Sequence, residues 1–200
     1  MIDAIVLAAG ESRRMGTAKQ LLPFGNVTVI EHIVDQLLLS RLDEVCVVVG
    51  HDGGQVAERL AGRRVRIVDN PDYASGMLSS VRCGLRALPE ARDWVLVALG
   101  DQPAVAPEWI DELVEAMQNS GKGIVVPVYQ GRRGHPLLLA ARYRQEVLTE
   151  HDDVGLRGLL RAHPEDVYEL AMPTAAVLSD MDDPADYQRE VGRRGSGGPT

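Results

Sequence analysis

A group of glycine, hydroxyl and basic residues follows the first apolar run of the sequence. Residues 6–25 read VLAAGESRRMGTAKQLLPFG, in which Ser12, Arg14, Gly16 and Lys19 lie between two apolar stretches. Glycines leave backbone N–H groups open to anionic oxygens, and basic side chains neutralise the charge on those oxygens. The spacing therefore predicts a polyphosphate-binding loop, with a solvated basic turn as the alternative. The loop is neither a Walker A motif nor G-x-G-x-x-G, which argues against a P-loop or a Rossmann dinucleotide site.

Short β-branched-rich runs alternate with helical patterns along the chain. The runs are AIVLAAG, EVCVVVG, RVRIVDN, DWVLVALGD and GKGIVVPV, and their near-continuous apolarity is typical of strands buried on both faces of a parallel sheet. Helical patterns cover residues 28–40, 54–62, 75–89 and 106–121. This alternation predicts an α/β layered fold with a mostly parallel sheet. Because the pattern is less regular after Gly131, we expect the sheet to finish with an antiparallel excursion.

Composition and charge limit the class of protein. The chain has 200 residues, 45% hydrophobic and 25% charged, which is typical of one soluble globular domain. Its net charge of -8 argues against nucleic-acid or anionic-membrane partners. No stretch approaches the roughly 20 apolar residues of a membrane span, and no signal-peptide pattern is present, so we expect a cytoplasmic protein. We expect the domain to cover residues 1–191 and the glycine-rich end, residues 192–200, to be a disordered tail.

The ends of the predicted strands carry most of the polar residues of interest. Ligands of parallel α/β sheets bind beyond the carboxyl ends of the strands, so these residues should share one rim. The loop after the third strand runs from Asn70 to Ser80, and the fourth strand leads into Asp101 and Gln102. A loop aspartate that caps the next helix is the alternative interpretation of Asp101.

The opening motif resembles the signature L-A-A-G-x-S-x-R-M-G-x-x-K-x-L-L of nucleotidyltransferases with a glycosyltransferase-A-like fold. Three further segments, GDQP at 100–103, GHPLLL at 134–139 and DMDDPADY at 180–187, resemble the molybdenum cofactor cytidylyltransferase family. The resemblance covers roughly residues 4–190. It implies a single-domain Rossmann-like three-layer α/β/α sandwich of the nucleotide-diphospho-sugar transferase-like type. It also implies transfer of CMP from CTP to molybdopterin, the organic part of the molybdenum cofactor, with release of pyrophosphate.

The same resemblance implies roles for individual residues in the nucleotide site. The backbone of residues 7–10 would lie along the base, and the L-A-A-G form is similar to that of CTP users, whereas GTP users tend to read L-A-G-G. Arg14, Lys19 and Asp101 would act in catalysis. The nucleotide-binding residues would be Leu7, Ala8, Ala9, Gly10, Ser12, Arg14, Gly16, Lys19, Asn70, Gly76, Ser79 and Ser80. Simple helix capping is the alternative for the serines.

Mg²⁺ is the cofactor that the resemblance implies, held by carboxylates at two strand ends. Asp101 would be one ligand and Asp182 the other, with Asp180 as the less favoured choice. Asp183 stands where the family usually has threonine in D-x-D-T-P. An acidic helix start, with Asp183 as the cap before Pro184, is the alternative interpretation.

The acceptor would bind at Gln102, Gly134, His135 and Pro136. Arg132, Arg133 and His135 could receive the terminal phosphate and pterin, and either charge state of His135 near pH 7 suits a hydrogen bond to them. We expect this turn to be exposed, and a plain exposed hairpin turn is the alternative for the two arginines. An apo-molybdoenzyme that receives the product is a possible partner. The alternative functions are nucleotidyl transfer to another small phosphate, a molybdopterin carrier or chaperone for a molybdoenzyme, and a redox enzyme on the same fold.

Overall fold

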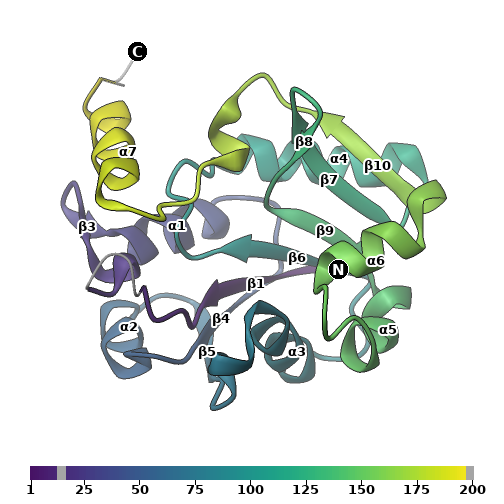
Figure 1. Cartoon of the computed structure of the whole chain (residues 1–200), viewed down its shortest axis with the longest axis horizontal. Coiled ribbons are helices and arrows are strands. Elements are labelled where there is room, and N and C mark those ends of the chain that lie inside the picture. The colour runs from purple at the N-terminus through teal and green to yellow at the C-terminus, as the bar shows by residue number, and fades with distance from the viewer. Residues whose placement is uncertain (13–16, 197–200) are drawn as a thin grey trace.

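A central sheet runs through the molecule with helices on both of its faces (Figure 1). The computed structural model describes residues 1–12 and 17–196. The strands of the sheet are β1 (Ile2–Ala8), β4 (Glu44–Val49), β5 (Val65–Asp69), β6 (Trp94–Leu99), β7 (Ile124–Tyr129), β8 (Arg132–Arg133), β9 (Leu137–Ala140) and β10 (Val167–Ala171). The helices are α1 (Val29–Leu38), α2 (Gly53–Arg59), α3 (Met77–Ala87), α4 (Pro107–Ser120), α5 (Arg144–Thr149), α6 (Leu156–Ala162) and α7 (Pro184–Ser196). Strands β2 (Pro23–Phe24) and β3 (Val27–Thr28) form a small separate hairpin.

The strand order is β10-β7-β9-β6-β1-β4-β5, and β8 pairs with β7. Strand β1 lies between β4 and β6 and is parallel to both, so its carboxyl end opens at the middle of the sheet. The predicted antiparallel excursion is present, but its main strand, β9, lies between β6 and β7 rather than at the end of the sheet. The sheet ends instead with β10, which is parallel to β7.

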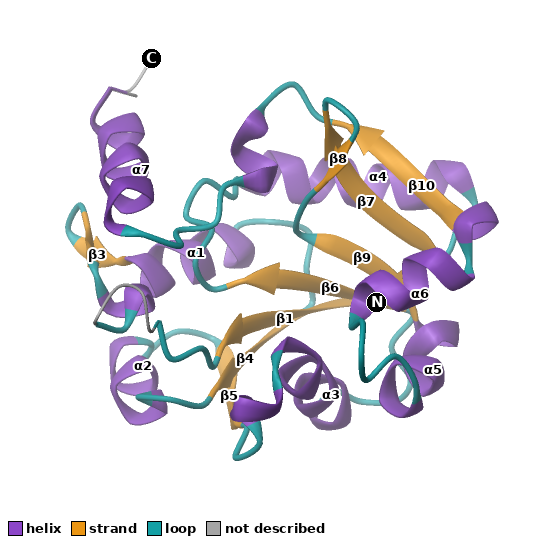
Figure 2. Cartoon of the chain, viewed as in Figure 1, coloured by secondary structure: helices purple, strands orange, loops and turns teal. Residues whose placement is uncertain are grey.

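The strands are almost entirely apolar because helices cover both faces of the sheet (Figure 2). Along β1, Ala4 and Val6 pack into the core formed with α1, α2 and α4, whereas Ile5 packs into the core formed with α3, α5 and α6. All three side chains are fully buried, as alternation along a strand between two helix layers requires. This arrangement confirms the predicted three-layer α/β/α sandwich.

Capping residues set the bounds of the helices beside the site. Thr28 and Glu31 form a capping box at the start of α1, where each side chain bonds the other residue's backbone N–H. Pro107 opens α4, and Gly121 ends it in a left-handed conformation. These residues place the helices so that the loops after β1 and β6 reach one edge of the sheet.

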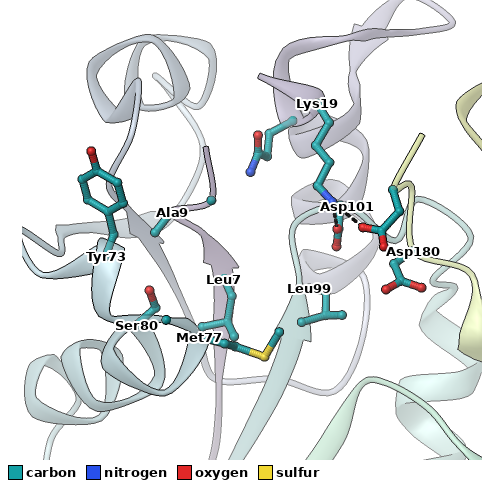
Figure 3. Close-up of a pocket in the computed structure, with 13 residues that line it drawn as sticks. Leu7, Ala9, Lys19, Tyr73, Met77, Ser80, Leu99, Asp101 and Asp180 are labelled. Carbon is teal, nitrogen blue, oxygen red and sulfur yellow. Dashed lines mark hydrogen bonds and ion pairs between the residues drawn. The ribbon is translucent and has the colours of Figure 1, made fainter. Parts of the chain in front are cut away.

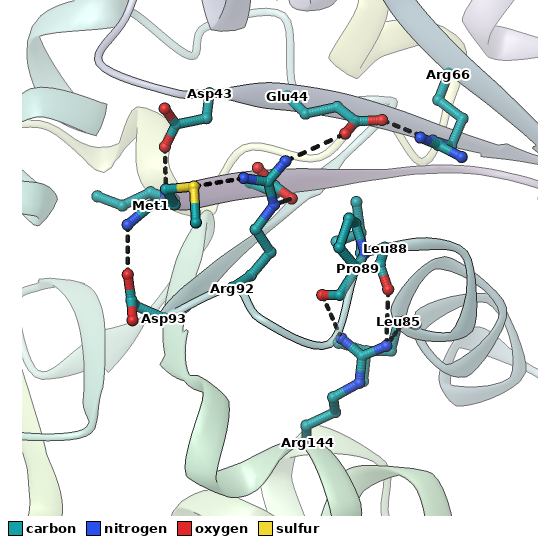
Figure 4. A network of polar contacts seen from close by, with 12 residues as sticks. Met1, Asp43, Glu44, Arg66, Leu85, Leu88, Pro89, Arg92, Asp93 and Arg144 are labelled. Atoms are coloured by element: carbon teal, nitrogen blue, oxygen red, sulfur yellow. Dashed lines mark hydrogen bonds and ion pairs between the residues drawn. The ribbon is translucent and has the colours of Figure 1, made fainter.

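The opposite edge of the sheet, at the amino ends of the strands, is held by ion pairs (Figure 4). The carboxylate of Asp3 is fully buried, and its Oδ2 lies 2.6 Å from Arg92 Nε. Arg92 Nη2 is 3.5 Å from Glu44 Oε2, and Glu44 Oε1 is 2.6 Å from Arg66 Nε. Burial raises the pKa of Asp3, and Arg92 opposes that shift. We infer that this network holds β1, β4 and the loop before β6 together.

Helix α7 lies beside the hairpin that follows the opening loop. Tyr187 donates a hydrogen bond to the carbonyl of Pro23 (2.6 Å), and Arg194 donates to that of Phe24 (2.5 Å). The expected domain boundary at residue 191 thus falls inside this helix. In the part of the chain that the structure describes, no helix has the length and apolarity that a bilayer span needs.

Candidate active site

A cavity of about 320 Å³ opens at the carboxyl ends of β1 and β6 (Figure 3). Lys19 reaches into it from one side, and Tyr73, Met77 and Ser80 lie across from it. Its lining residues come from five separate segments of the chain: Leu7, Ala9, Gly10, Lys19, Gln20, Tyr73, Gly76, Met77, Ser80, Leu99, Asp101, Asp180 and Asp182. The cavity therefore lies where ligands bind in parallel α/β sheets.

Lys19 stands between two carboxylates in this cavity. Its ammonium contacts the carboxylate of Asp101, and Nζ lies 3.4 Å from Asp182 Oδ1. Burial raises the pKa of Asp101, Lys19 opposes this, and Asp180 and Asp182 raise it further. Burial also acts to lower the pKa of Lys19, but the two carboxylates outweigh it, so the pKa is raised and the ammonium stays charged.

Backbone contacts hold the acidic segment against the end of β6. Met181 is fully buried, and its N–H donates to the carbonyl of Asp101 (3.1 Å). Asp180 and Asp182 flank Met181, so both point away from the core although this segment is a loop rather than a strand. Gly100 is required beside them, because a Cβ there would lie 2.8 Å from the carbonyl oxygen of Leu7.

Part of the opening loop can be placed. Ser12 has a left-handed backbone (φ 51°), and its Oγ accepts from the N–H of Lys19 (3.1 Å), so this hydroxyl closes the loop rather than lining the cavity. The predicted Arg14 and Gly16 lie outside the described residues. Gln20, which sequence reasoning did not identify, is buried and lines the cavity.

The loop after β5 forms the opposite wall. The buried side chain of Asn70 donates to Ser79 Oγ (2.9 Å) and Ser80 Oγ (3.0 Å), and it accepts from the N–H of Asp72 (3.1 Å). Asn70 and Ser79 therefore support the wall from behind, whereas Gly76 and Ser80 line the cavity.

Sequence reasoning missed Tyr73 and Met77 on the same wall. Met77 is 56% exposed, which is unusual for a large apolar side chain. Its only sequence signal is its place at the start of a helix after a strand, which many surface residues share.

A second cavity, of about 540 Å³, adjoins the first. Gly76 and Met77 line both cavities, so α3 begins at the boundary between them. The second cavity also contains Gly134 and His135 of the GHP segment. Of the remaining predicted residues, Ala8, Gln102 and Pro136 are buried and do not line either cavity within the described part of the chain.

The prediction of an exposed turn is wrong for the GHP segment. Gly134 and Pro136 are buried, and the backbone N–H of His135 donates to the carbonyl of Val177 (3.0 Å). A Cβ at Gly134 would lie 2.1 Å from that same carbonyl oxygen, so only glycine fits. Burial lowers the pKa of His135 to about 4, and the imidazole is therefore neutral at pH 7.

Charged residues of α6 were also missed. Arg157 and Arg161 line the second cavity, whereas Arg132, predicted from the RR pair, does not. Arg133 lines the cavity, but its Nε lies 2.8 Å from Glu169 Oε1. The sequence GLRGLLRAH carries arginines at helical spacing, but nothing in it shows which strand end α6 covers.

Asp101 and Asp182 do not bring their carboxylate oxygens together into a metal-binding cluster in the described part of the chain. Among the described residues, the group of histidine and carboxylate donor atoms within 4.8 Å of one another is Glu146, Glu150 and His151, on the α5 side of the sheet. Asp101 and Asp182 instead share the ammonium of Lys19. Their carboxylate oxygens are ligands of the type that Mg²⁺ prefers, so the donor chemistry of this cavity fits a divalent cation.

Comparison with known proteins agrees with this geometry. A model of the MobA-like NTP transferase domain matches residues 4–167. The chain belongs to this family. The MobA-like chain is similar in structure to "A nucleotidyl transferase from Methanothermobacter thermautotroptrophicus", with a TM-score of 0.87, 30% identity and 99% of each chain covered. The family and this neighbour make the chain a nucleotidyltransferase.

Three curated relatives of this MobA-like chain differ in their names. The molybdenum cofactor cytidylyltransferase of Escherichia coli (strain K12) is 28% identical over 187 residues, which cover 93% of each chain. The probable molybdenum cofactor guanylyltransferase of Mycolicibacterium paratuberculosis (strain ATCC BAA-968 / K-10) is 32% identical over 196 residues, 94% of this chain and 93% of that one. The nicotine blue oxidoreductase of Paenarthrobacter nicotinovorans is 33% identical over 172 residues, 82% and 83% of the two chains.

Proposed function

We propose that this MobA-like nucleotidyltransferase transfers CMP from CTP to the phosphate of molybdopterin. A phosphate oxygen of the acceptor attacks the α-phosphorus, and the bond from that phosphorus to the β-phosphate oxygen breaks, which releases pyrophosphate. The observation that carries the proposal is the pair of cavities that meet at Gly76 and Met77. One cavity holds Lys19 and the strand-end carboxylates, and the other is large enough for a second substrate.

The charge of the first cavity supports a metal-dependent reaction. Among the described lining residues, Asp101, Asp180 and Asp182 give three negative charges against the one positive charge of Lys19, a net charge of -2 when all are ionised. A triphosphate would be repelled there unless a cation bound with it. We propose Mg²⁺, held by Asp101 and Asp182 or, less favoured, Asp180. When bound, the ion would offset charge on the phosphate oxygens and orient the triphosphate.

The basic residues of the opening loop complete the proposed phosphate site. Lys19 is charged and lies beside the carboxylates, so it can exchange its contact with Asp101 for a phosphate oxygen once a cation neutralises them. We propose the same partner for Arg14. These residues and the metal position the reactants and balance charge, which is most of the catalysis that phosphoryl transfer needs.

Cytosine is the proposed base. The L-A-A-G sequence of residues 7–10 supports this choice, and Leu7, Ala9 and Gly10 line the cavity. Curated relatives named as cytidylyl- and guanylyltransferases are almost equally similar to this chain. We further propose a cytoplasmic location, where CTP is available.

The test measures pyrophosphate release from each of the four nucleoside triphosphates with magnesium and purified molybdopterin. We expect rapid release with CTP that depends on the acceptor, and loss of that release in Asp101→Asn. The proposal fails if no triphosphate gives acceptor-dependent release, or if GTP is preferred.

A redox enzyme is the second candidate, because the nicotine blue oxidoreductase is 33% identical over 172 residues. The carboxylates around Lys19 favour phosphate chemistry over hydride transfer, since a hydride acceptor needs no such cluster. Oxidation or reduction of a small molecule by the chain, in the absence of any pyrophosphate release, would favour this second function.

A further inference from the structure

The second cavity has an unbalanced positive charge. Its charged side chains are Arg133, Asp152, Arg157 and Arg161. Arg133 pairs with a glutamate of β10, and Asp152 contacts an arginine of α3, so these two charges are neutralised within the protein. Across residues 1–12 and 17–196, neither Arg157 nor Arg161 forms a hydrogen bond or an ion pair. Both side chains are exposed, so their two positive charges are open to an anionic ligand.

The two arginines share one face of α6. They are four residues apart, which brings side chains of a helix side by side. Like charges at this spacing weaken a helix slightly, and an anion bound between them would remove that repulsion. The positive charge of Arg157 acts to lower the pKa of His135, and the negative charge of Asp180 in the first cavity acts to raise it. The chain after α6 leads to the start of β10, which lies beside the amino end of β7. Arg161 is one helical turn nearer to that end than Arg157, so it lies further from the first cavity.

The walls around this charge are apolar. Leu78 and Val81 of α3 face Leu160 of α6, and the exposed Met77 (56%) and Val154 (45%) stand at the rim. Apolar walls with a few polar groups at one place are typical of sites for ring-containing small molecules. The cavity therefore fits a ligand with a flat apolar or heteroaromatic body and an anionic group near α6.

The reacting phosphate does not account for this anion site. That phosphate must reach the α-phosphorus in the first cavity, across the boundary at Gly76 and Met77. Arg157 and Arg161 line the second cavity and are absent from the described lining of the first. An acceptor that extends into the second cavity could therefore place another charged group beside α6.

We propose that Arg157 and Arg161 bind a second anionic group of the acceptor, distinct from the phosphate that receives the nucleotide. This inference rests on the proposed function for the identity of the acceptor, but the anion site itself does not. An oxyanion on a ring system is the class of group that two guanidinium groups recognise.

The first test compares Arg157→Gln and Arg161→Gln with Arg86→Gln, an exposed arginine of α3 outside both cavities. Losing a hydrogen bond to a charged group should raise the KM for molybdopterin by roughly ten- to a hundredfold. The KM for CTP should stay unchanged in all three variants, and Arg86→Gln should match the wild type. An unchanged molybdopterin KM in both α6 variants would overturn the inference.

The second test does not depend on nucleotidyl transfer. Anilinonaphthalene sulfonate joins apolar rings to one anionic group, and N-phenylnaphthylamine has similar rings without the charge. We expect both α6 variants to weaken binding of the sulfonate by roughly tenfold and to leave the uncharged probe unaffected. If the wild type transfers no nucleotide but shows this difference, the proposed function fails and the anion site stands. Equal binding of the sulfonate by wild type and variants would contradict the anion site.

Discussion

Lys19 Nζ lies 3.4 Å from Asp182 Oδ1, although 163 residues separate them in the sequence. The same ammonium contacts Asp101, so a single positive charge connects the loop after β1, the end of β6 and the segment before α7. All three groups are brought to the place where the proposed triphosphate and cation would bind.

Asp101→Asn keeps the size of the side chain and removes its charge. We expect turnover to fall by at least about a hundredfold, because a ligand of the proposed cation is lost while the fold is kept. Steady-state pyrophosphate release and thermal unfolding measure the two effects. Asp153→Asn, an exposed carboxylate outside both cavities, is the matched control. Turnover like that of the wild type in Asp101→Asn would remove Asp101 from the metal site.

Lys19→Ala and Arg14→Ala remove the proposed charges against the triphosphate. We expect the affinity for magnesium–CTP to fall by roughly tenfold or more in each, since a charged hydrogen bond is lost. Titration calorimetry with CTP and magnesium measures it directly. Lys122→Ala is the control, because the Lys122 ammonium donates to a backbone carbonyl near the amino ends of β7 and β10, away from the cavity. The opening loop would be a solvated turn if both variants bound CTP as the wild type does.

His135→Ala should raise the KM for molybdopterin and leave the affinity for CTP close to that of the wild type. Because burial holds the pKa of His135 near 4, the ring is neutral above that pH and gives no charge to a phosphate. The effect should therefore be constant between about pH 6 and pH 8. The buried position also predicts a lower thermal midpoint, in contrast to an exposed turn.

His135→Gln is the matched variant, because its amide keeps a hydrogen-bonding group. We expect it to recover part of the affinity for molybdopterin. A step in the wild-type KM near pH 6.5 that both His135 variants abolish would show that the ring titrates in the working range, against this account.

Asp166 gives a prediction about stability. Burial acts to raise its pKa, but hydrogen bonds from Tyr143, Arg142 and the N–H of Gly123 outweigh it and lower the pKa to about 2. A pKa below the unfolded value stabilises the fold above about pH 4, and this contribution is lost as pH falls through about 2. Asp166→Asn should lower the free energy of unfolding by on the order of 2 kcal/mol at pH 7. Denaturant unfolding at several pH values measures this difference, which should shrink toward pH 2. A difference that does not depend on pH would contradict the assignment.

The layered fold could be predicted because its signals are local. Buried parallel strands need continuous apolar runs such as residues 44–49, and the helices between them begin and end at capping residues such as Pro107 and Gly121. The position of β9 could not be predicted. Its insertion between β6 and β7 depends on the pairing with β6, which lies about 40 residues earlier in the chain and leaves no local pattern.

Some residues of the candidate site could likewise be predicted from the sequence, and others could not. Asp101 comes just after β6 and Lys19 lies at the end of the loop after β1, so the rule for strand ends brings them to one edge. The burial of His135 depends on Val177, and the exposure of Arg157 depends on how α6 packs over the sheet. The spacing of residues in the sequence predicts neither feature, because each depends on how distant segments pack together.

The measurement that tests the central claim most directly gives the enzyme equal concentrations of CTP and GTP with magnesium and molybdopterin. Mass spectrometry then identifies the dinucleotide product, and pyrophosphate is measured in the same reaction. We predict the cytosine dinucleotide in large excess, with one pyrophosphate for each molecule formed and no product from Asp101→Asn. A guanine dinucleotide as the main product, or consumption of molybdopterin without pyrophosphate, would contradict it.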